Sequence, residues 1–193
     1  METKIILIRH AECVGNISNR LSGITDFELT DNGKRQAQKL AKELHNKNID
    51  VIYSSPLRRA MDTAKYIARN NNIKIINKDE RLIEINYGVC DGMSWNKIDN
   101  KYPLVRKLWK EMYKYPILIP GQEEFIDVSK RMNEAIKDIS NKNQWKTICI
   151  VSHGIAIQAF VSFYYNDITK KIGEIQQLKN AEYIEFIIWI EKI

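Results

Sequence analysis

KIILIRH, residues 4–10, is the stretch from which the fold of this chain can be read. Its first part, residues 4–8, is a short apolar run rich in β-branched side chains, which predicts a strand buried on both faces, as in a parallel sheet. Arg9 and His10 follow this strand directly. Ligands of open α/β folds bind at the carboxyl ends of the strands, so we expect a site at these two polar side chains.

The rest of the chain alternates between strand and helix patterns. Further strands are predicted at 51–53, 73–76, 147–151 and 183–190. Helices are predicted at 30–47 with Thr30 as N-cap, from Ser55 as cap and Pro56 at the first position to about Ala68, and at 96–114, 123–139 and 155–165. This order predicts an α/β fold, a three-layer sandwich whose mostly parallel central sheet has helices on both faces. The last strand is apolar at nearly every residue, which leaves both an interior and an edge position open for it.

Length and composition fit one globular domain. The 193 residues are 44% hydrophobic and 28% charged, an ordinary balance for a chain that buries its own core. We expect a single domain over residues 1–193 with a helical insertion at about 93–125. Cys13, Cys90 and Cys149 are far apart, which indicates a reducing cytoplasm rather than a disulfide framework. The first apolar run is too short for a signal peptide or a membrane span, so we expect a cytoplasmic protein with no membrane partner.

The charge pattern favours a small anionic ligand. The net charge is +6, but the basic residues are spread along the chain among acidic ones, without a run of five. A nucleic-acid-binding protein usually concentrates its lysines and arginines, so we expect no nucleic-acid partner. We also find no DxD or HExxH pattern that would hold a metal, and expect neither a metal nor another cofactor.

Several predicted strands bring polar side chains to the same edge of the sheet. The first ends in Arg9 and His10, the second leads into a helix whose first turn contains Arg59, and the fourth ends at His153. The loop after the third strand offers Glu84. Because the carboxyl ends of parallel strands meet at one edge, we expect two histidines, two arginines and one glutamate to lie close together.

This set of residue types suits phosphoryl transfer. The guanidinium groups of Arg9 and Arg59 can offset the charge of a phosphate dianion, and His10 can attack phosphorus to form a phosphohistidine. His153 can donate a hydrogen bond to the phosphoryl oxygens as charge builds up. Glu84 can protonate the leaving alkoxide and then take a proton from the attacking water.

The same residues resemble the motifs of a known family, the histidine phosphatase superfamily, also called phosphoglycerate-mutase-like. The similarity extends in order over nearly the whole chain, and its blocks are Arg9-His10-Ala11-Glu12, Asn16, Ser22-Gly23, Leu29-Thr30, Gly33, Ser54–Ala64, Glu84–Gly88, Pro120–Glu123 and Val151–Gly154. The resemblance implies that His10 is the phosphorylated nucleophile, that Glu84 is the proton donor, and that Arg9, Arg59 and His153 form the phosphate pocket. It further implies that Asn16 and Gly154 help to bind phosphate, and that Ser22, Gly23 and Tyr87 contact the substrate.

Departures from the family pattern favour its phosphatase branch. The cofactor-dependent mutases carry a pair of arginines after a helical tryptophan, whereas Trp109 is followed here by Lys110 and Glu111. Ile155 also stands where these mutases have Asn. We therefore predict a phosphatase for a small phosphorylated metabolite, such as a sugar phosphate, α-ribazole phosphate or phosphoserine. A mutase, a phospho-ligand binding module with weak activity, and a phosphatase of phosphoproteins stay open as alternatives.

Overall fold

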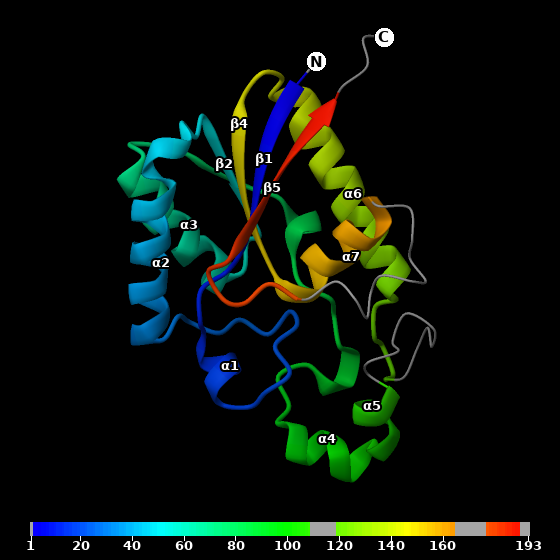
Figure 1. The fold of residues 1–193 in the computed structure, drawn as a ribbon. Coiled ribbons are helices and arrows are strands. Elements are labelled where there is room, and N and C mark those ends of the chain that lie inside the picture. The colour runs from blue at the N-terminus through cyan, green and yellow to red at the C-terminus, as the bar shows by residue number, and fades with distance from the viewer. Residues whose placement is uncertain (1, 109–118, 165–176, 190–193) are drawn as a thin grey trace.

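The computed structural model describes residues 2–108, 119–164 and 177–189. Within these residues the centre of the fold is a five-stranded sheet in the order β3-β2-β4-β1-β5 (Figure 1). β1 to β4 run parallel, and β5 pairs antiparallel with β1 at one edge. The predicted α/β sandwich with a mostly parallel sheet is confirmed, and the last strand lies at an edge. The strands are β1 (Glu2–Arg9), β2 (Val51–Ser54), β3 (Ile76–Lys78), β4 (Thr147–Ser152) and β5 (Tyr183–Trp189).

Helices cover both faces of this sheet (Figure 1). On one face, α2 (Asp31–Glu43) and α3 (Arg58–Asn70) share a core with Ile6 and Ile8 of β1. On the other face, α6 (Phe125–Lys142) and α7 (Gly154–Tyr164) share a core with Ile5 and Leu7. Successive strand residues point to opposite faces, so β1 is buried on both sides as predicted. Each of these four side chains is fully buried, which stabilises the fold by roughly 1.5–3 kcal/mol per side chain.

The remaining helical elements are short. They are α1 (Val14–Ile17), α4 (Trp95–Lys101), α5 (Pro103–Leu108), and the 3-10 turns η1 (Leu44–Lys47), η2 (Glu80–Leu82) and η3 (Gly88–Cys90). Figure 1 places α4 and α5 together, beyond the edge of the sheet at which β1 and β4 end. The predicted helical insertion at about 93–125 contains both of them, and its boundaries stay a prediction.

The ends of the strands are level with one another. Arg9 of β1 is paired with Ser152 of β4, and Ser54 of β2 is paired with Val151. β5 runs in the opposite direction, and its first residue, Tyr183, is paired with Ile8 near the end of β1. The segment that precedes β5 therefore lies at the carboxyl ends of the parallel strands, together with the loops that follow these strands.

Turn and cap chemistry explains where the predicted boundaries are right or wrong. Thr30 is the N-cap of α2 as predicted, because its hydroxyl accepts a hydrogen bond from the Gly33 amide at 2.9 Å. The prediction of Ser55 as cap of α3 is wrong, since Leu57 occupies that position. The predicted strand at 73–76 begins only at Ile76. Asn72 has a φ of 57° and turns the chain after α3, so the preceding residues belong to a turn.

Proline divides the long helix predicted at 96–114. Pro103 begins α5 after α4 has ended at Lys101, because proline lacks the amide hydrogen of a helix interior but fits a first helical position. The later part of this prediction, from residue 109, lies outside the described residues, as do residue 165 of the helix predicted at 155–165 and residue 190 of the last strand. The predicted helices at 123–139 and 155–165 are confirmed as α6 and α7.

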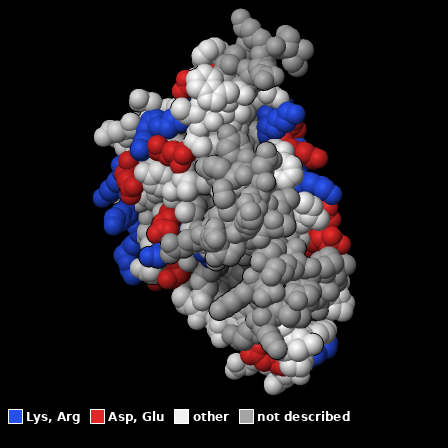
Figure 2. Space-filling model, turned by 45° about the vertical axis from the view of Figure 1, so that its right-hand side comes forward, with Lys and Arg blue, Asp and Glu red and all other residues white. Residues whose placement is uncertain are grey.

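The described surface carries both signs of charge. Figure 2 shows lysine and arginine side chains interspersed with aspartate and glutamate on the face in view. Among the described residues, no helix is long and apolar enough to cross a membrane.

Candidate active site

His10 lies at the first position after β1, and its side chain is only 3% exposed. The backbone amide of His10 donates to Ser152 O at 3.0 Å, which continues the pairing of β1 with β4 by one residue. The ring Nδ1 lies 2.8 Å from Ala11 O, a carbonyl that can only accept, so Nδ1 carries the hydrogen. The lone pair is therefore on Nε2, to which Arg59 Nε donates at 3.3 Å.

His153 follows β4 and lies beside His10. The centroids of the two rings are 5.1 Å apart. His153 Nε2 is 2.8 Å from Ser55 Oγ, and His153 Nδ1 is buried without a hydrogen-bond partner among the described residues. Burial and the positive charge of Arg59 lower the pKa of both imidazoles well below the ordinary 6.5, so both rings are neutral at neutral pH.

Two guanidinium groups, one fully buried and one partly buried, lie near these rings. Arg59 lies in the first turn of α3, is fully buried, and donates to the backbone oxygens of Thr25 at 2.9 Å and Gly23 at 2.6 Å. Arg9 donates to Leu178 O at 2.5 Å, and its Nε is buried without a partner among the described residues. Burial lowers the pKa of both groups below the ordinary value of an arginine, and the nearby negative charge of Glu84 partly opposes this shift.

Neither arginine forms an ion pair with a carboxylate of the described residues, although exposed arginines of the chain do. Arg58, the neighbour of Arg59, pairs with Glu28 and Asp62 at the surface. A buried cation without a counter-ion costs free energy, which a bound anion recovers. Two cations without a carboxylate partner among the described residues, one of them in contact with His10 Nε2, suit the binding of an anion.

Glu84 follows η2 and is 6% exposed. One carboxylate oxygen accepts from the Ile85 amide at 3.0 Å and from the Ala156 amide at 2.9 Å, and the other accepts from the Ile155 amide at 3.1 Å. The latter two amides belong to the first turn of α7, whose N-terminal dipole favours a negative charge. Glu84 thus joins the loop after η2 to the helix that begins directly after His153.

The other predicted site residues occupy the rim of this cluster. Asn16 Oδ1 accepts from the Cys13 amide at 2.9 Å and from Asn180 Nδ2 at 3.3 Å. Ser22 contributes its backbone oxygen, 3.4 Å from Arg59 Nη2. At Gly154 a Cβ atom would meet the end of the exposed Gln177 side chain, which can move aside, and would lie 3.2 Å from Arg9 Cζ. At Gly23 a Cβ would lie 2.8 Å from the ring of Tyr87, which is 4% exposed and packs into the core.

Comparison with known proteins identifies the family. The family described as "Histidine phosphatase superfamily (branch 1)" matches residues 5–189, which is almost the whole chain. This chain belongs to the histidine phosphatase superfamily. It is thus a phosphomonoester hydrolase, and the predicted family and enzyme class are confirmed.

Relatives within the superfamily include both phosphatases and mutases. Phosphoserine phosphatase 1 of Hydrogenobacter thermophilus is 36% identical over 156 residues, which cover 81% of this chain and 73% of the relative. A probable phosphoglycerate mutase, GpmB, of Yersinia pestis is 32% identical over 161 residues, covering 82% and 73%. A mutant phosphoserine phosphatase from Entamoeba histolytica, solved in complex with phosphoserine, superimposes with a TM-score of 0.81 at 30% identity, covering 95% of this chain and 90% of that one.

Several residues of this histidine phosphatase site were missed by the sequence analysis. Ser55 was assigned to a helix cap, although its place directly after β2 was a signal for the site. Asn180 donates to His10 O at 3.1 Å, and the Ala181 amide donates to the backbone oxygens of both Arg9 and His10. Asn180 and Ala181 could not be found because the sequence showed no sign that the last strand is antiparallel.

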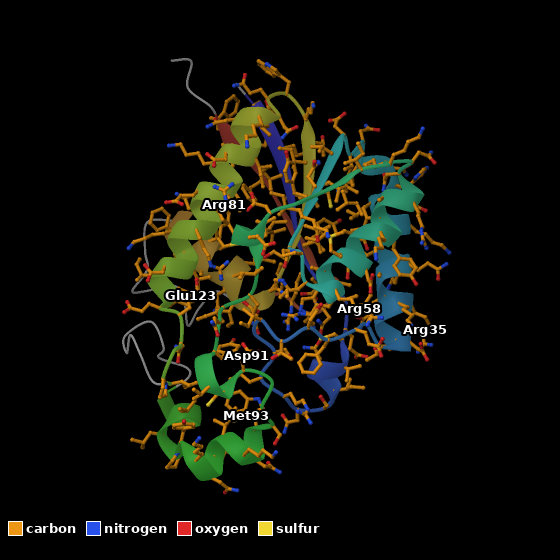
Figure 3. All side chains as sticks on the ribbon, turned by 180° about the vertical axis from the view of Figure 1, so that it is seen from behind. Arg35, Arg58, Arg81, Asp91, Met93 and Glu123 are labelled. Carbon is orange, nitrogen blue, oxygen red and sulfur yellow. The ribbon has the colours of Figure 1, made fainter. Side chains whose placement is uncertain are left out.

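Asp91 is a further residue that the sequence analysis missed. It accepts hydrogen bonds from the amides of Ile24 and Thr25 at 2.9 and 2.8 Å and from the Tyr87 amide at 3.3 Å. Figure 3 shows Asp91 between the ribbon segments that it joins. Asp91 thereby fixes the loop whose carbonyl groups hold Arg59. Among the described residues, no group of three or more His, Cys, Asp or Glu side chains is placed to bind a metal.

Proposed function

We propose that the chain hydrolyses a small phosphomonoester in two steps, through a phosphohistidine at His10 and without a metal. The observation that supports this most directly is the fully buried Arg59, whose Nε donates to the Nε2 lone pair of His10, together with the partly buried Arg9. An unprotonated imidazole is required for attack on phosphorus, and the lowered pKa of His10 keeps it in that form.

In the first step, His10 Nε2 bonds to phosphorus and the bond from phosphorus to the ester oxygen breaks. Arg9 and Arg59 offset the charge of the phosphoryl oxygens, and His153 donates a hydrogen bond to them. Arg59 Nε already donates a hydrogen bond to the attacking nitrogen, and it redirects this hydrogen bond to a phosphoryl oxygen as the new bond forms, while its proton stays on the guanidinium group. The carbonyl groups that hold the other Arg59 nitrogens keep the guanidinium plane in place.

In our proposal Glu84 is protonated when the substrate is bound, and it gives this proton to the leaving alkoxide. In the second step its carboxylate takes a proton from water, which attacks the phosphohistidine and releases inorganic phosphate with neutral His10. The backbone amides of α7 orient this side chain, and they belong to the turn that follows His153. The proton donor and the phosphate pocket are therefore positioned by the same strand-to-helix junction.

Phosphoserine is the substrate that we propose to test first. The relative from Hydrogenobacter thermophilus and the one from Entamoeba histolytica are both named as phosphoserine phosphatases. We place the protein in the cytoplasm, in agreement with three free cysteines in a chain with no disulfide among its described residues. The mixed charges of the surface fit our proposal of a small metabolite rather than a nucleic acid as ligand.

The decisive experiment follows phosphate release from phosphoserine, 3-phosphoglycerate and sugar phosphates in the presence of EDTA. His10→Ala should lower turnover at least about 10³-fold, as expected for a lost nucleophile. Acid-labile, base-stable labelling of the wild type with ³²P from the substrate, absent in the variant, would identify the phosphohistidine. Normal turnover in His10→Ala, or turnover only after metal addition, would contradict the proposal.

A mutase is the second candidate, because the probable phosphoglycerate mutase of Yersinia pestis is 32% identical. The residues that distinguish mutases in the sequence, Lys110 and Glu111, lie outside the described residues. Incubation with 3-phosphoglycerate and 2,3-bisphosphoglycerate separates the two candidates. Conversion to 2-phosphoglycerate faster than phosphate release would favour the mutase.

A further inference from the structure

Arg131 of α6 spans the segment that carries Glu84. Its Nη1 donates to Arg81 O and to Ile83 O, both at 2.7 Å, and its Nη2 donates to Glu84 O at 3.1 Å. The residues between η2 and η3 form neither helix nor strand, so their carbonyl groups lack the partners that regular structure would supply. The Arg131 guanidinium group provides partners for three carbonyl groups of residues 81–84.

Glu123 holds this guanidinium group in turn. Its two carboxylate oxygens accept from Arg131 Nε at 2.7 Å and from Nη2 at 3.0 Å. The same carboxylate accepts from the Asn86 amide at 3.2 Å, and the Glu123 amide donates to Asn86 O at 2.9 Å. The pair is mostly buried, with side-chain exposures of 16% and 22%. Planar bidentate contacts of this kind fix orientation as well as distance.

We propose that Arg131, oriented by Glu123, is a positioning residue that holds the Glu84 carboxylate in place for proton transfer to the leaving group. This inference rests on the proposed role of Glu84 as proton donor. The Glu84 side chain is held by amides of α7, and its backbone oxygen is held by Arg131 of α6. Loss of the second support lets the backbone shift while the phosphate pocket, built from β1, β4 and α3, stays intact.

Lysine is the most informative replacement for Arg131. Lysine keeps the positive charge, and therefore the electric field at the site. It cannot make the five hydrogen bonds of the planar guanidinium group. A shift of about 1 Å can cost on the order of 10²-fold in rate. We therefore expect Arg131→Lys to lower kcat/KM for phosphoserine by about 10- to 100-fold, and for p-nitrophenyl phosphate by less than about 3-fold, since nitrophenolate needs little protonation. Inhibition by orthovanadate, which reports the phosphate pocket, should be unchanged.

Arg81→Gln is the matched control. Arg81 also joins η2 to α6, through Asp79 at 2.8 Å and Asp138 at 2.7 Å, and Figure 3 shows it and Glu123 on the same side of the molecule, beside α6. Its replacement should lower stability without changing the ratio of the two kcat/KM values. A ratio changed as strongly by Arg81→Gln as by Arg131→Lys would overturn the inference. Glu123→Gln is a second test that should reproduce the Arg131→Lys ratio in milder form.

A double variant separates this inference from the proposed function. Glu84→Gln should show the same preference for the nitrophenyl ester, and adding Arg131→Lys to it should cause no further loss, because both act through one carboxylate. Additive losses, or equal losses on both esters from Arg131→Lys, would overturn the positioning role while leaving the proton donor in place. If Glu84→Gln itself lowered both kcat/KM values equally, the assigned proton donor would be wrong, and the inference would fail with it.

Discussion

Acidification should destabilise this protein well before its carboxylates titrate. His10 and His153 are buried and neutral, with folded-state pKa values well below 6.5 because of burial and the neighbouring Arg59. In the unfolded chain both rings take up a proton near pH 6.5. The unfolded state therefore binds more protons than the folded state below this pH. The contribution of the two neutral rings to the free energy of unfolding is fully present above pH 6.5. It is lost as the pH falls toward the folded-state pKa values.

The number of buried rings sets the size of this effect. At one pH unit below the unfolded-state pKa, the free energy of unfolding is lower by about 1.4 kcal/mol for each ring that stays neutral in the folded state. Two rings together should lower the free energy of unfolding by about 3 kcal/mol between about pH 7.5 and 5.5. That is a sizeable share of the roughly 5–15 kcal/mol that holds a typical domain together.

Urea unfolding curves, recorded by circular dichroism at a series of pH values, measure this loss directly. His10→Gln should remove about half of the pH dependence, since one of the two rings is gone. A variant that replaces the exposed His45 serves as the control, and it should keep the slope of the wild type. A free energy of unfolding that is constant over this range, or one that rises on acidification, would refute the assignment of two neutral buried imidazoles.

Three glycine and serine substitutions test the geometry of the site. Gly154→Ala should lower kcat/KM by about threefold to tenfold, because the added Cβ would lie 3.2 Å from Arg9 Cζ and displace this guanidinium group; wild-type steady-state kinetics would contradict the crowding there. Gly23→Ala would place a Cβ 2.5 Å from the backbone oxygen of Ile85, and we expect urea curves to show a loss of about 1–3 kcal/mol together with reduced turnover. Ser55→Ala removes the 2.8 Å contact between Ser55 Oγ and His153 Nε2. It should reduce kcat about tenfold and lower the free energy of unfolding by about 1 kcal/mol. An unchanged kcat would show that this hydroxyl does not orient the His153 ring.

Local patterns were sufficient to predict the parts of the fold that depend on neighbouring residues. The apolar run of β1 and the Thr30 cap are decided within a few residues, and both are confirmed. Clustering of the predicted histidines and arginines followed from one rule, that parallel strands end at the same edge. Their catalytic roles stay predictions until the variants described above are measured.

Features that depend on distant partners could not be read from the sequence. β5 is an edge strand, but Ile187 and Trp189 are apolar at exposed positions, which hides the alternation that an edge strand normally shows. Ser55 followed by proline is also typical of a helix start, and its actual partner, His153, is 98 positions away. The role of Arg131 could not be predicted from the sequence, because the carbonyl groups that it binds come from another part of the chain.

The position of β1 in the sheet has a consequence for biosynthesis. The two neighbours of β1 are β4 and β5, which begin only at Thr147 and Tyr183. While the ribosome is still adding the preceding residues, the first strand has two unpaired edges, and such edges invite aggregation. His10 leaves the ribosome long before β4 and β5, yet it reaches its final surroundings only when both of these strands have emerged. Nascent chains should therefore stay exposed to aggregation and gain enzymatic activity only after β5 has been synthesised.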